Sequence, residues 1–557
     1  MDPTTSKTSE RNDEGSTSNS SVETNSQKSG KVEKLPTPKQ VTMDTTSTLE
    51  LEEHKNGAFK SSSTPKKAFK EMTMKERMNY VREIITVEPL VVCYAMATVL
   101  CTPALLVLEF EKACRVNEGY DDKICDDIVY KEDTIYINES IKIQIRIANM
   151  HSWQQPLQYV MPVILVLFLG SYSDRHKIRK PFLLLPVIGE FLAVLGCMLC
   201  VIFMHTWPLE AQGISQTVIP SFFGGPSMLI MSAFAYIADV STVEMRTLRV
   251  GIVQFLLSLS SPIVQSFSGK LFTVIGYLWI LLIAAVLFAI GLLYGIFFIK
   301  EPKQPVGVVE KKALIRDVFD PKHAIETFNV LVKKKKGNKR LLIVLLMINL
   351  FIWAGVSQGE LSVFYLFTVT VYKWGPVEYS LFGTINTVVH LIGTAISIPL
   401  LSTYLKLSDL LIAVISFLDK VLCNIIFALY LKPTGLYIGT VVSIVTAISS
   451  IAIRSQATKI VNADDLGKAQ SLFAVTEAIA PAVFTPIYNT GVYNNTIEVF
   501  PSAFFLVGAA LHFIGSGILA FMYKLAQKKN EMSQNGETNL GYIHENNDSN
   551  IIETTYI

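Results

Sequence analysis

The chain of 557 residues is 50% hydrophobic and only 17% charged, with a mean hydropathy of +0.38. This composition exceeds the apolar content of ordinary soluble domains and predicts a protein embedded in a lipid bilayer. The formal net charge is +2, and the cations gather in short clusters rather than in a stripe interleaved with aromatic residues. The sequence therefore indicates no nucleic-acid partner.

The chain begins with a polar segment, residues 1–80, that is rich in Ser, Thr, Lys and Glu. Such a segment cannot bury enough apolar surface to fold, so we expect a disordered cytoplasmic tail. No signal peptide precedes the first apolar run, which is therefore expected to act as its own insertion signal.

Apolar runs of about 20 residues, the length that crosses a bilayer as a helix, follow this tail. A loop at 300–340, which contains the basic run Lys333–Arg340, divides them into two sets of six, at 81–299 and 341–524. A second polar tail, 525–557, is expected to be cytoplasmic. The runs lie near 88–110, 154–172, 182–204, 216–240, 248–272, 274–299, 341–371, 377–401, 409–431, 434–454, 467–490 and 500–524. The sequence thus predicts an all-α membrane protein with twelve transmembrane helices in two six-helix halves.

Basic residues mark one face of the membrane. The loop Gly170–Pro181, with the sequence GSYSDRHKIRKP, places Arg175, Arg179 and neighbouring lysines between two apolar runs. By the positive-inside rule such loops are cytoplasmic, and both termini then lie on the same side. We expect a multi-pass protein of the plasma membrane, with the lysosomal membrane as the alternative.

The large loop 111–153 falls on the opposite, outer side and leans acidic. It holds a glycosylation sequon at Asn138, and a second sequon at Asn494 also falls outside, so both are candidates for glycosylation. Cys114 and Cys125 lie in the same loop, in an oxidising setting, and are candidates for a local disulfide.

Two further patterns have a plain structural interpretation. Cys197 and Cys200 form a CxxC pair inside an apolar run without histidine partners, so we expect packing residues rather than a metal site. The chain ends in Thr555–Ile557, a pattern that adds a strand to some PDZ domains, although an ordinary polar tail is the favoured interpretation.

Several segments carry a family resemblance. The loop Gly170–Pro181 resembles the one that joins the second and third helices of major facilitator superfamily carriers. The segment Phe222–Gln254, together with IRSQATKIV from Arg454 and FAVTEAIAPAVFTPIY from Phe473, resembles the solute carrier 46 family, which includes the proton-coupled folate transporter. The resemblance implies the superfamily's fold and symport of organic anions, with folates and cyclic dinucleotides among the family's substrates.

The resemblance also assigns roles to single residues. Asp174 matches the family's loop acid and, with Arg175 and Arg179, is expected to control gating at the inner face. Arg454 matches an arginine that helps transport in folate carriers, and it is expected to hold the negative charge of the solute.

Two positions depart from the folate carriers. Gln254 replaces the glutamate that couples protons, and Phe222 replaces an aspartate; both stay candidates for solute contact. The run 341–371 also lacks the folate carriers' histidine. Because glutamine does not titrate, any protons must be carried by other groups.

Ionisable residues inside the apolar runs are functional candidates, because a charge at the bilayer centre costs at least about 2.5 kcal/mol. Glu477 lies about 15 Å along its predicted helix and is the leading candidate for carrying protons. Lys420 either attracts an anionic solute or neutralises its neighbour Asp419 or another buried acid. His390 is either a proton relay or a packing residue. The remaining proton-coupling candidates are Asp419, Glu190 and Glu360.

These patterns lead to one main hypothesis, a secondary active transporter of a folate-like or cyclic-dinucleotide-like anion, coupled to protons and working by alternating access. The alternatives are a receptor that binds solute without moving it and a facilitative carrier without proton coupling. An enzyme built on His390 would need an acid partner, a nucleophile elbow or a metal cluster, and the sequence offers none of them. We therefore expect no enzyme activity and no cofactor.

Overall fold

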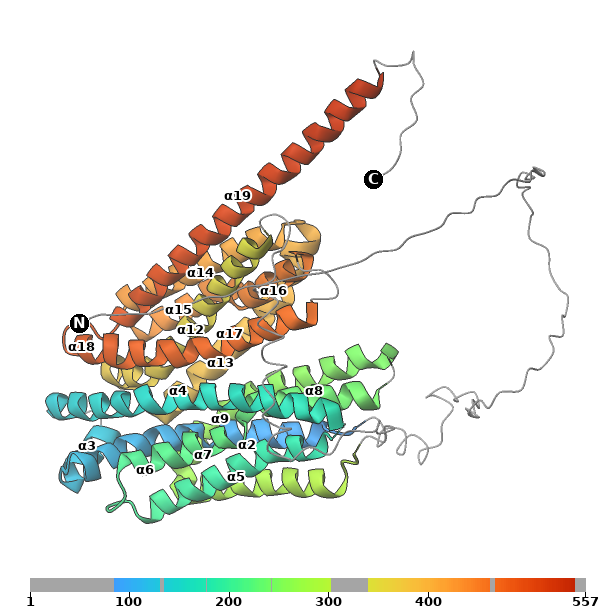
Figure 1. Cartoon of the computed structure of the whole chain (residues 1–557). Helices are drawn as coiled ribbons and strands as arrows, with labels where there is room; N and C mark the ends of the chain where they lie inside the picture. Colours follow the sequence, from blue (N-terminus) through green and yellow to red (C-terminus); the bar gives the residue numbers. More distant parts are fainter. Residues whose placement is uncertain are drawn as a thin grey trace, which may run out of the picture. The chain divides into compact units, whose positions relative to one another are not determined.

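The computed structural model describes residues 85–130, 135–176, 178–241, 243–301, 339–460 and 466–545. These described residues form helices and connecting turns, and no strand occurs among them (Figure 1). The predicted tail 1–80, nearly all of the central loop 300–340 and the terminal Thr555–Ile557 lie outside the described residues.

Much of the segment predicted to be an outer loop is helical. After α2 (Glu88–Lys112) come the π-helical turn η2 (Ala113–Asn117), the short α3 (Asp122–Tyr130) and the long α4 (Ile137–His176). The predicted loop covers 111–153, but α4 already begins at Ile137. Its first part is amphipathic, with Ile143, Ile147 and Met150 buried. The polar residues between them lower the mean hydropathy, so a search for apolar runs does not detect this part of the helix.

The fourth predicted run is a broken helix. After α5 (Lys180–Ile202), it consists of α6 (Leu209–Gly213), η3 (Ile214–Val218), α7 (Ile219–Phe222) and α8 (Gly225–Val240). The break lies at Gly224 and Gly225, which have φ values of 91° and 51°. These left-handed conformations favour glycine, so the Gly-Gly pair is required where α7 and α8 meet.

The next predicted runs, 248–272 and 274–299, fall in one continuous element, α9 (Val243–Phe297). Gly276 has non-helical angles of φ 76° and ψ −178°, so the element turns there, near the start of the second predicted run. Two helices are therefore joined by a single glycine.

The second half contains helices of comparable length. They are α12 (Lys339–Tyr372), α13 (Pro376–Ile398), η4 (Pro399–Tyr404), α14 (Asp409–Leu429), α15 (Pro433–Val442), η5 (Ser443–Ile448), α16 (Ser449–Ile460), α17 (Leu466–Pro486), η7 (Ile487–Tyr493), α18 (Asn494–Thr496) and α19 (Ala503–Glu545). The last helix continues well past the predicted end at residue 524, because the residues that follow include many good helix formers such as Lys, Gln, Glu and Met.

Nine helices of the described part are long and apolar enough to cross a membrane. That number counts α9 once, although it turns at Gly276, and it excludes α4 and α17, which contain polar segments and internal prolines. The multi-pass all-α architecture is confirmed, while the number twelve stays a prediction.

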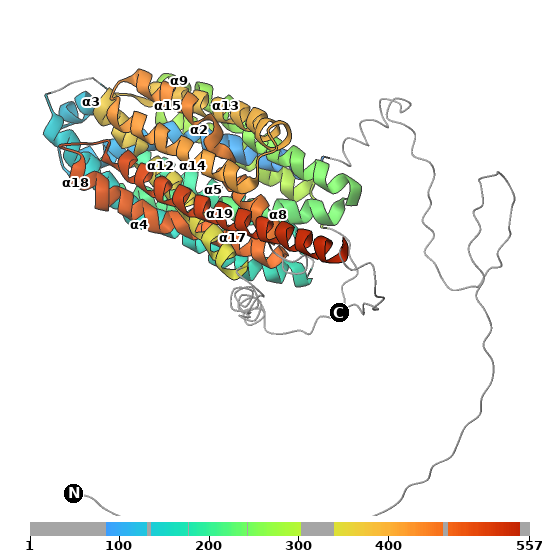
Figure 2. The same cartoon turned by 90° about the horizontal axis from the view of Figure 1, so that it is seen from above.

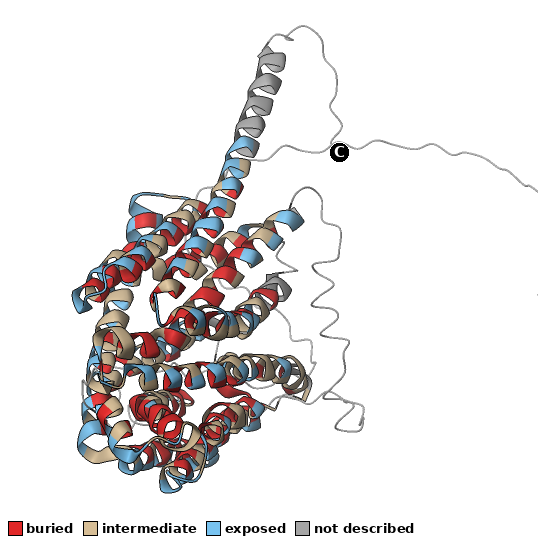
Figure 3. Ribbon diagram, turned by 90° about the vertical axis from the view of Figure 1, so that its left-hand side faces the viewer, coloured by how far each residue is buried: buried red, intermediate tan, exposed pale blue. Residues whose placement is uncertain are grey.

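Within each half the helices pack on one another, α2 against α9 and α14 against α19. The halves meet where α4 packs against α17 and α9 against α13 (Figures 1 and 2). Large apolar side chains such as Phe297, Leu422 and Phe513 are exposed, as expected for a surface that faces lipid. Figure 3 shows that exposed and buried positions alternate along the helices.

Candidate functional site

Two neighbouring cavities lie between the halves. We call them the N-half lobe, of about 420 Å³ and lined mainly by α2, α4, α5 and α12, and the C-half lobe, of about 250 Å³ and lined mainly by α12, α13 and α14. Gln265, Leu361 and Tyr379 line both lobes, so the two are adjacent. A site at the interface of two helical halves is the expected position for solute in this kind of bundle.

The C-half lobe contains a buried ion pair. Lys420 Nζ of α14 donates to Glu360 Oε2 of α12 at 2.7 Å, and the two side chains are 14% and 8% exposed. Asn424 Nδ2 donates to the other carboxylate oxygen at 2.5 Å. The pair places a cation and a titratable acid in one solute-sized cavity.

Asp419 points away from its neighbour Lys420. Its Oδ2 accepts a hydrogen bond from the Val445 backbone N–H at 3.0 Å and one from the Thr446 hydroxyl at 3.2 Å, both in η5. Of the readings left open by the sequence, the structure therefore shows Lys420 paired with Glu360. Asp419 instead holds the short 3₁₀ segment beside the lobe.

His390 of α13 also lines the C-half lobe. Its Nδ1 is buried and has no hydrogen-bond partner in the described part of the chain. The structure thus places Lys420, Glu360 and His390, three of the predicted candidates, around a single cavity.

Glu190 lines the other lobe. Tyr94 of α2 donates its hydroxyl to Glu190 Oε1 at 3.0 Å. Across the same lobe, the Tyr159 hydroxyl of α4 donates to Gln358 Oε1 of α12 at 3.0 Å, which links the two halves.

A second buried pair, Glu109 and His151, also lines the N-half lobe and is not among the residues predicted from the sequence. Glu109 lies at the end of a predicted run, and His151 was assigned to the outer loop. The sequence pattern did not mark this start: Ile141, Ile143, Ile145 and Ile147 alternate with polar residues at the two-residue spacing typical of a strand, which does not extend α4 towards its true start.

Arg454 and Glu477 form an ion pair between α16 and α17, with side chains that are 31% and 25% exposed. From the sequence, Arg454 is expected to bind solute and Glu477 to carry protons, whereas in the structure the two side chains pair with each other. Neither is among the residues that line the two lobes.

Gln254 and Phe222 have exposed side chains, and neither is among the lining residues of the two lobes. The expectation that they contact solute is therefore not supported by the geometry of these cavities. Because a helix turns by about 100° per residue, sequence position alone does not fix the direction of a side chain.

At the end of the bundle that holds the basic loop, Arg179 is 5% exposed and its Nε donates to Asp239 Oδ2 of α8 at 2.7 Å. Its Nη1 donates to the Ser173 hydroxyl at 2.9 Å. The side chains of Asp174 and Arg175 lie outside the described ones. Arg179 thus joins the end of α4 to α8.

At the opposite end, polar contacts join the two halves. Gln144 Oε1 of α4 accepts hydrogen bonds from the hydroxyls of Thr370, at 2.7 Å, and Tyr493, at 2.9 Å. Asn494 Nδ2 donates to Asn149 Oδ1 at 2.8 Å. We call these contacts the outer clasp, after the predicted orientation.

The two sequon asparagines differ in accessibility because one of them takes part in the outer clasp. Asn138 is exposed near the start of α4, whereas Asn494 is half-buried and hydrogen-bonded to Asn149. The Asn494 amide is therefore less accessible than Asn138 in this conformation.

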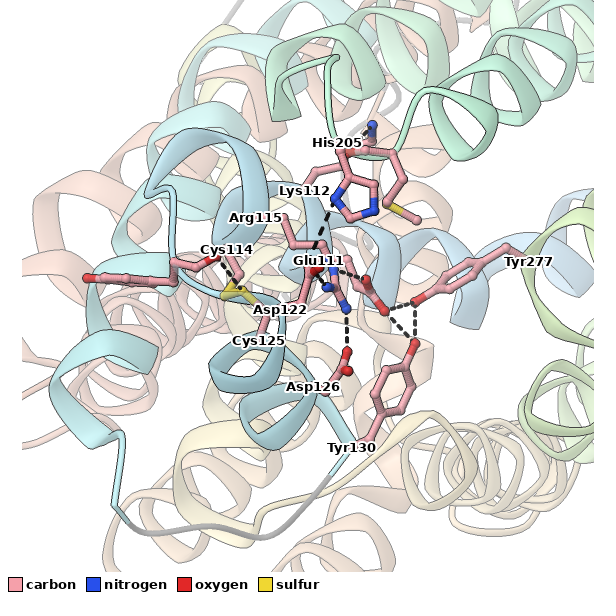
Figure 4. Close-up of polar contacts among 12 residues, drawn as sticks. Glu111, Lys112, Cys114, Arg115, Asp122, Cys125, Asp126, Tyr130, His205 and Tyr277 are labelled. Carbon is pink, nitrogen blue, oxygen red and sulfur yellow. Dashed lines mark hydrogen bonds and ion pairs between the residues drawn. A yellow bond between two sulfur atoms is a disulfide. The ribbon is translucent and has the colours of Figure 1, made fainter.

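Cys114 and Cys125 are joined by a disulfide that ties η2 to α3 (Figure 4). Beside it, Arg115 pairs with the carboxylates of Glu111, Asp122 and Asp126.

Tyr130, at the end of α3, donates its hydroxyl to Glu111 Oε1 at 2.5 Å (Figure 4). Burial, followed by the charge of Glu111, raises the pKa of Tyr130, so this hydroxyl remains a donor at neutral pH.

A family model for the Major Facilitator Superfamily matches residues 148–485. Among curated proteins, the chain is similar to the Lysosomal proton-coupled steroid conjugate and bile acid symporter SLC46A3 of Rattus norvegicus, with 24% identity and coverage of 77% of this chain and 92% of the relative. It is also similar to the Probable peptidoglycan muropeptide transporter SLC46 of Drosophila melanogaster, with 21% identity and 74% and 80% coverage. A third relative, the Proton-coupled folate transporter of Rattus norvegicus, is 23% identical with 64% and 75% coverage.

Solved structures show the same fold. The nucleoside transporter NupG matches with a TM-score of 0.54 and 14% identity, covering 78% of this chain and 99% of that one. The peptide transporter POT in complex with alafosfalin matches with a TM-score of 0.54 and 12% identity, covering 81% and 98%. The predicted resemblance to the solute carrier 46 family is confirmed, and these relatives are membrane transporters, not enzymes. The chain belongs to the Major Facilitator Superfamily.

Proposed function

We propose that this transporter is a proton-coupled symporter of an organic anion and that Lys420 and Glu360 form its central site. The observation that supports this proposal is the 2.7 Å ion pair inside the C-half lobe. Buried charges are costly to desolvate, so an ion pair that lines a cavity between the two halves has a functional rather than a stabilising explanation.

The pair suggests how a proton and an anion are coupled. While Glu360 is ionised, it neutralises Lys420 and competes with any anionic solute for the ammonium group. When Glu360 takes up a proton, the carboxyl becomes neutral and Lys420 is left with an uncompensated charge. A solute carboxylate, sulfate or phosphate then replaces Glu360 as the partner of Lys420.

This mechanism assigns the coupling proton to Glu360 rather than to Glu477. From the sequence, Glu477 is the leading candidate because of its depth in the predicted helix. In the structure Glu477 is paired with Arg454, and neither of them lines the two lobes. We propose instead that the Arg454–Glu477 pair holds α16 against α17 during the transport cycle.

The relatives narrow the proposed solutes. Their names refer to steroid conjugates and bile acids, to a muropeptide and to folate. We propose a solute that carries an anionic group on a larger organic body, and we retain folate-like and cyclic-dinucleotide-like anions as candidates. The anionic group would bind Lys420, and the body would extend past Gln265 and Tyr379 into the N-half lobe.

For alternating access, we propose that contacts at the two ends of the bundle control opening to each side of the membrane. The outer clasp joins the halves through Gln144, Thr370 and Tyr493, so opening towards that side requires these hydrogen bonds to break. Gating at the basic loop is assigned to Asp174, Arg175 and Arg179, as expected from the family resemblance. We propose a plasma-membrane location with both termini cytoplasmic, and the lysosomal membrane as the alternative, since one relative is named as lysosomal.

Uptake into proteoliposomes tests the proposal. The purified full-length protein is reconstituted and offered labelled steroid sulfate, bile acid, reduced folate, muropeptide and cyclic dinucleotide, with and without an acidic outer buffer. Accumulation of at least one anion that depends on the proton gradient supports symport. Equilibration without accumulation indicates a facilitative carrier, and binding without uptake indicates a receptor; either result contradicts the proposal.

A further inference from the structure

Glu109 and His151 form a buried pair in the N-half lobe that the proposed mechanism does not use. Glu109 comes from α2 and His151 from α4, and their side chains are 2% and 8% exposed. His151 Nε2 lies 3.1 Å from Glu109 Oε2, within hydrogen-bond distance. Both residues line the lobe, where a solute could reach them.

Among the described residues, one hydrogen-bonding atom of this pair has no partner. Gln216 Nε2 donates to Glu109 Oε1 at 3.1 Å, so each carboxylate oxygen has a partner. Gln216 is itself held by Gln212, whose Nε2 donates to Gln216 Oε1 at 3.1 Å. His151 Nδ1, in contrast, is buried and has no hydrogen-bond partner in the part of the chain that the structure describes.

We propose that Glu109 and His151 form a second, proton-dependent binding site, which accepts a hydrogen-bond acceptor group of the solute, a carbonyl or an anionic oxygen. Without a bound proton, Nε2–H donates to Glu109 and Nδ1 carries a lone pair, so the ring offers no donor to the solute. A proton on Nδ1 converts this atom into a charged donor that lacks a protein acceptor. The solute oxygen supplies that acceptor.

Charge acts in the same direction. With a neutral imidazole the pair carries the full negative charge of Glu109, which repels an anion in a poorly solvated lobe. One bound proton makes the pair neutral overall and removes this repulsion. An anion is therefore admitted to the lobe together with a proton, which leaves on the far side when the solute is released.

Other titratable groups face the same lobe and must be distinguished from the pair. They come from α2, α4, α5, α12 and α13 and are Cys101, Tyr159, Glu190, Cys197, Tyr365 and Tyr379. Among them Glu190 is the only carboxyl group, and it has a separate partner in Tyr94. A Glu190→Gln variant therefore serves as the control for a carboxylate of the same lobe outside the pair.

The proton part of the inference is tested by nuclear magnetic resonance of the full-length protein in lipid nanodiscs, with carbon-13 at the histidine ring. The signal that disappears in His151→Gln belongs to His151, and Glu109→Gln identifies the same signal by its changed shift if the first variant does not fold. We expect this signal to titrate between acidic and neutral pH in the wild type and in Glu190→Gln, and to titrate differently in Glu109→Gln. A His151 signal that does not change over this range overturns the inference.

The solute part rests on the proposed function and uses the same probes, a steroid sulfate, a bile acid, a reduced folate and a muropeptide. A probe that the wild type transports should shift the His151 signal at acidic pH, with affinity weaker by about tenfold at neutral pH, or about 1.4 kcal/mol. Transported probes that leave the signal unchanged overturn the solute site. If no probe is transported, the proposed organic-anion function fails, while the titration of His151 still decides whether the pair binds a proton.

Discussion

Lys420 and Glu360 are 60 positions apart in the chain, yet their charged groups lie 2.7 Å apart inside the C-half lobe. Helices α12 and α14 bring them together, and Asn424 holds the second carboxylate oxygen. A cation whose partner is neutralised by a proton is available to an anion only when the proton is bound. This relationship is the basis for the coupling that we propose.

Replacement of Lys420 by Met should abolish anion uptake and destabilise the protein, because it leaves Glu360 buried without its cation. Removal of one partner of a buried pair typically costs about 3–5 kcal/mol. The double variant Lys420→Met with Glu360→Met should regain much of the lost thermal stability but no uptake. Thermal unfolding and proteoliposome uptake measure the two effects, with Lys432→Met, at an exposed lysine of the same half, as the control. Wild-type uptake by the double variant would remove the pair from the site.

The Arg454–Glu477 pair leads to a second prediction. Because each residue is the partner of the other, Arg454→Ala and Glu477→Gln should both slow uptake, and their effects should not add in the double variant. Residues in contact typically show interaction energies of about 0.5–3 kcal/mol in such cycles. The measurement is the uptake rate at low solute concentration for the four proteins of the cycle. Additive effects would mean that the two side chains act independently.

The sequence predicted much of this architecture because bilayer spans are long and apolar. The ends of α12, α13 and α14 fall close to the predicted bounds, whereas the predicted run 434–454 is divided among α15, η5 and α16. The amphipathic start of α4 was missed, because hydropathy averages over the polar and apolar faces of a helix.

The candidate site was harder to predict, for a different reason. Charged residues inside apolar runs identified Lys420, Glu360 and His390, but only the packing of helices shows which of them share a cavity. The same packing joins Arg454 to Glu477, which the sequence treated separately. Glu109 and His151 were missed because one lies at the end of a predicted run and the other in a segment taken for a loop.

The outer clasp predicts a cross-link that blocks transport. Asn149 and Asn494 lie on opposite halves with their side chains in contact at 2.8 Å, so cysteines at these positions should form a disulfide under mild oxidation. The cross-link should hold this end closed and stop uptake, and a reducing agent should restore it. The two single-cysteine variants serve as controls. An oxidised double variant that still transports at the wild-type rate would show that the clasp does not open during the cycle.

The disulfide between Cys114 and Cys125 predicts an effect on stability rather than on solute recognition. Cys114→Ser with Cys125→Ser should lower the melting temperature, because the covalent link between α3 and η2 is lost while the ion pairs of Arg115 remain. Disulfides typically contribute about 2–4 kcal/mol. Thermal unfolding in detergent checks this, with Cys93→Ser, at a free cysteine of α2, as the control. An unchanged melting temperature would mean that the remaining contacts hold α3 by themselves.

The most direct test of the central claim is uptake by Glu360→Gln in proteoliposomes, measured both as accumulation driven by a proton gradient and as exchange of labelled for unlabelled anion. Glutamine keeps the shape and most of the hydrogen bonding of Glu360 but neither carries a charge nor binds a proton, so Lys420 is permanently available. The account predicts that gradient-driven accumulation falls while exchange continues, and that the pH dependence left in exchange is that of the Glu109–His151 pair. Accumulation by Glu360→Gln at the wild-type level would show that the coupling proton does not bind to Glu360.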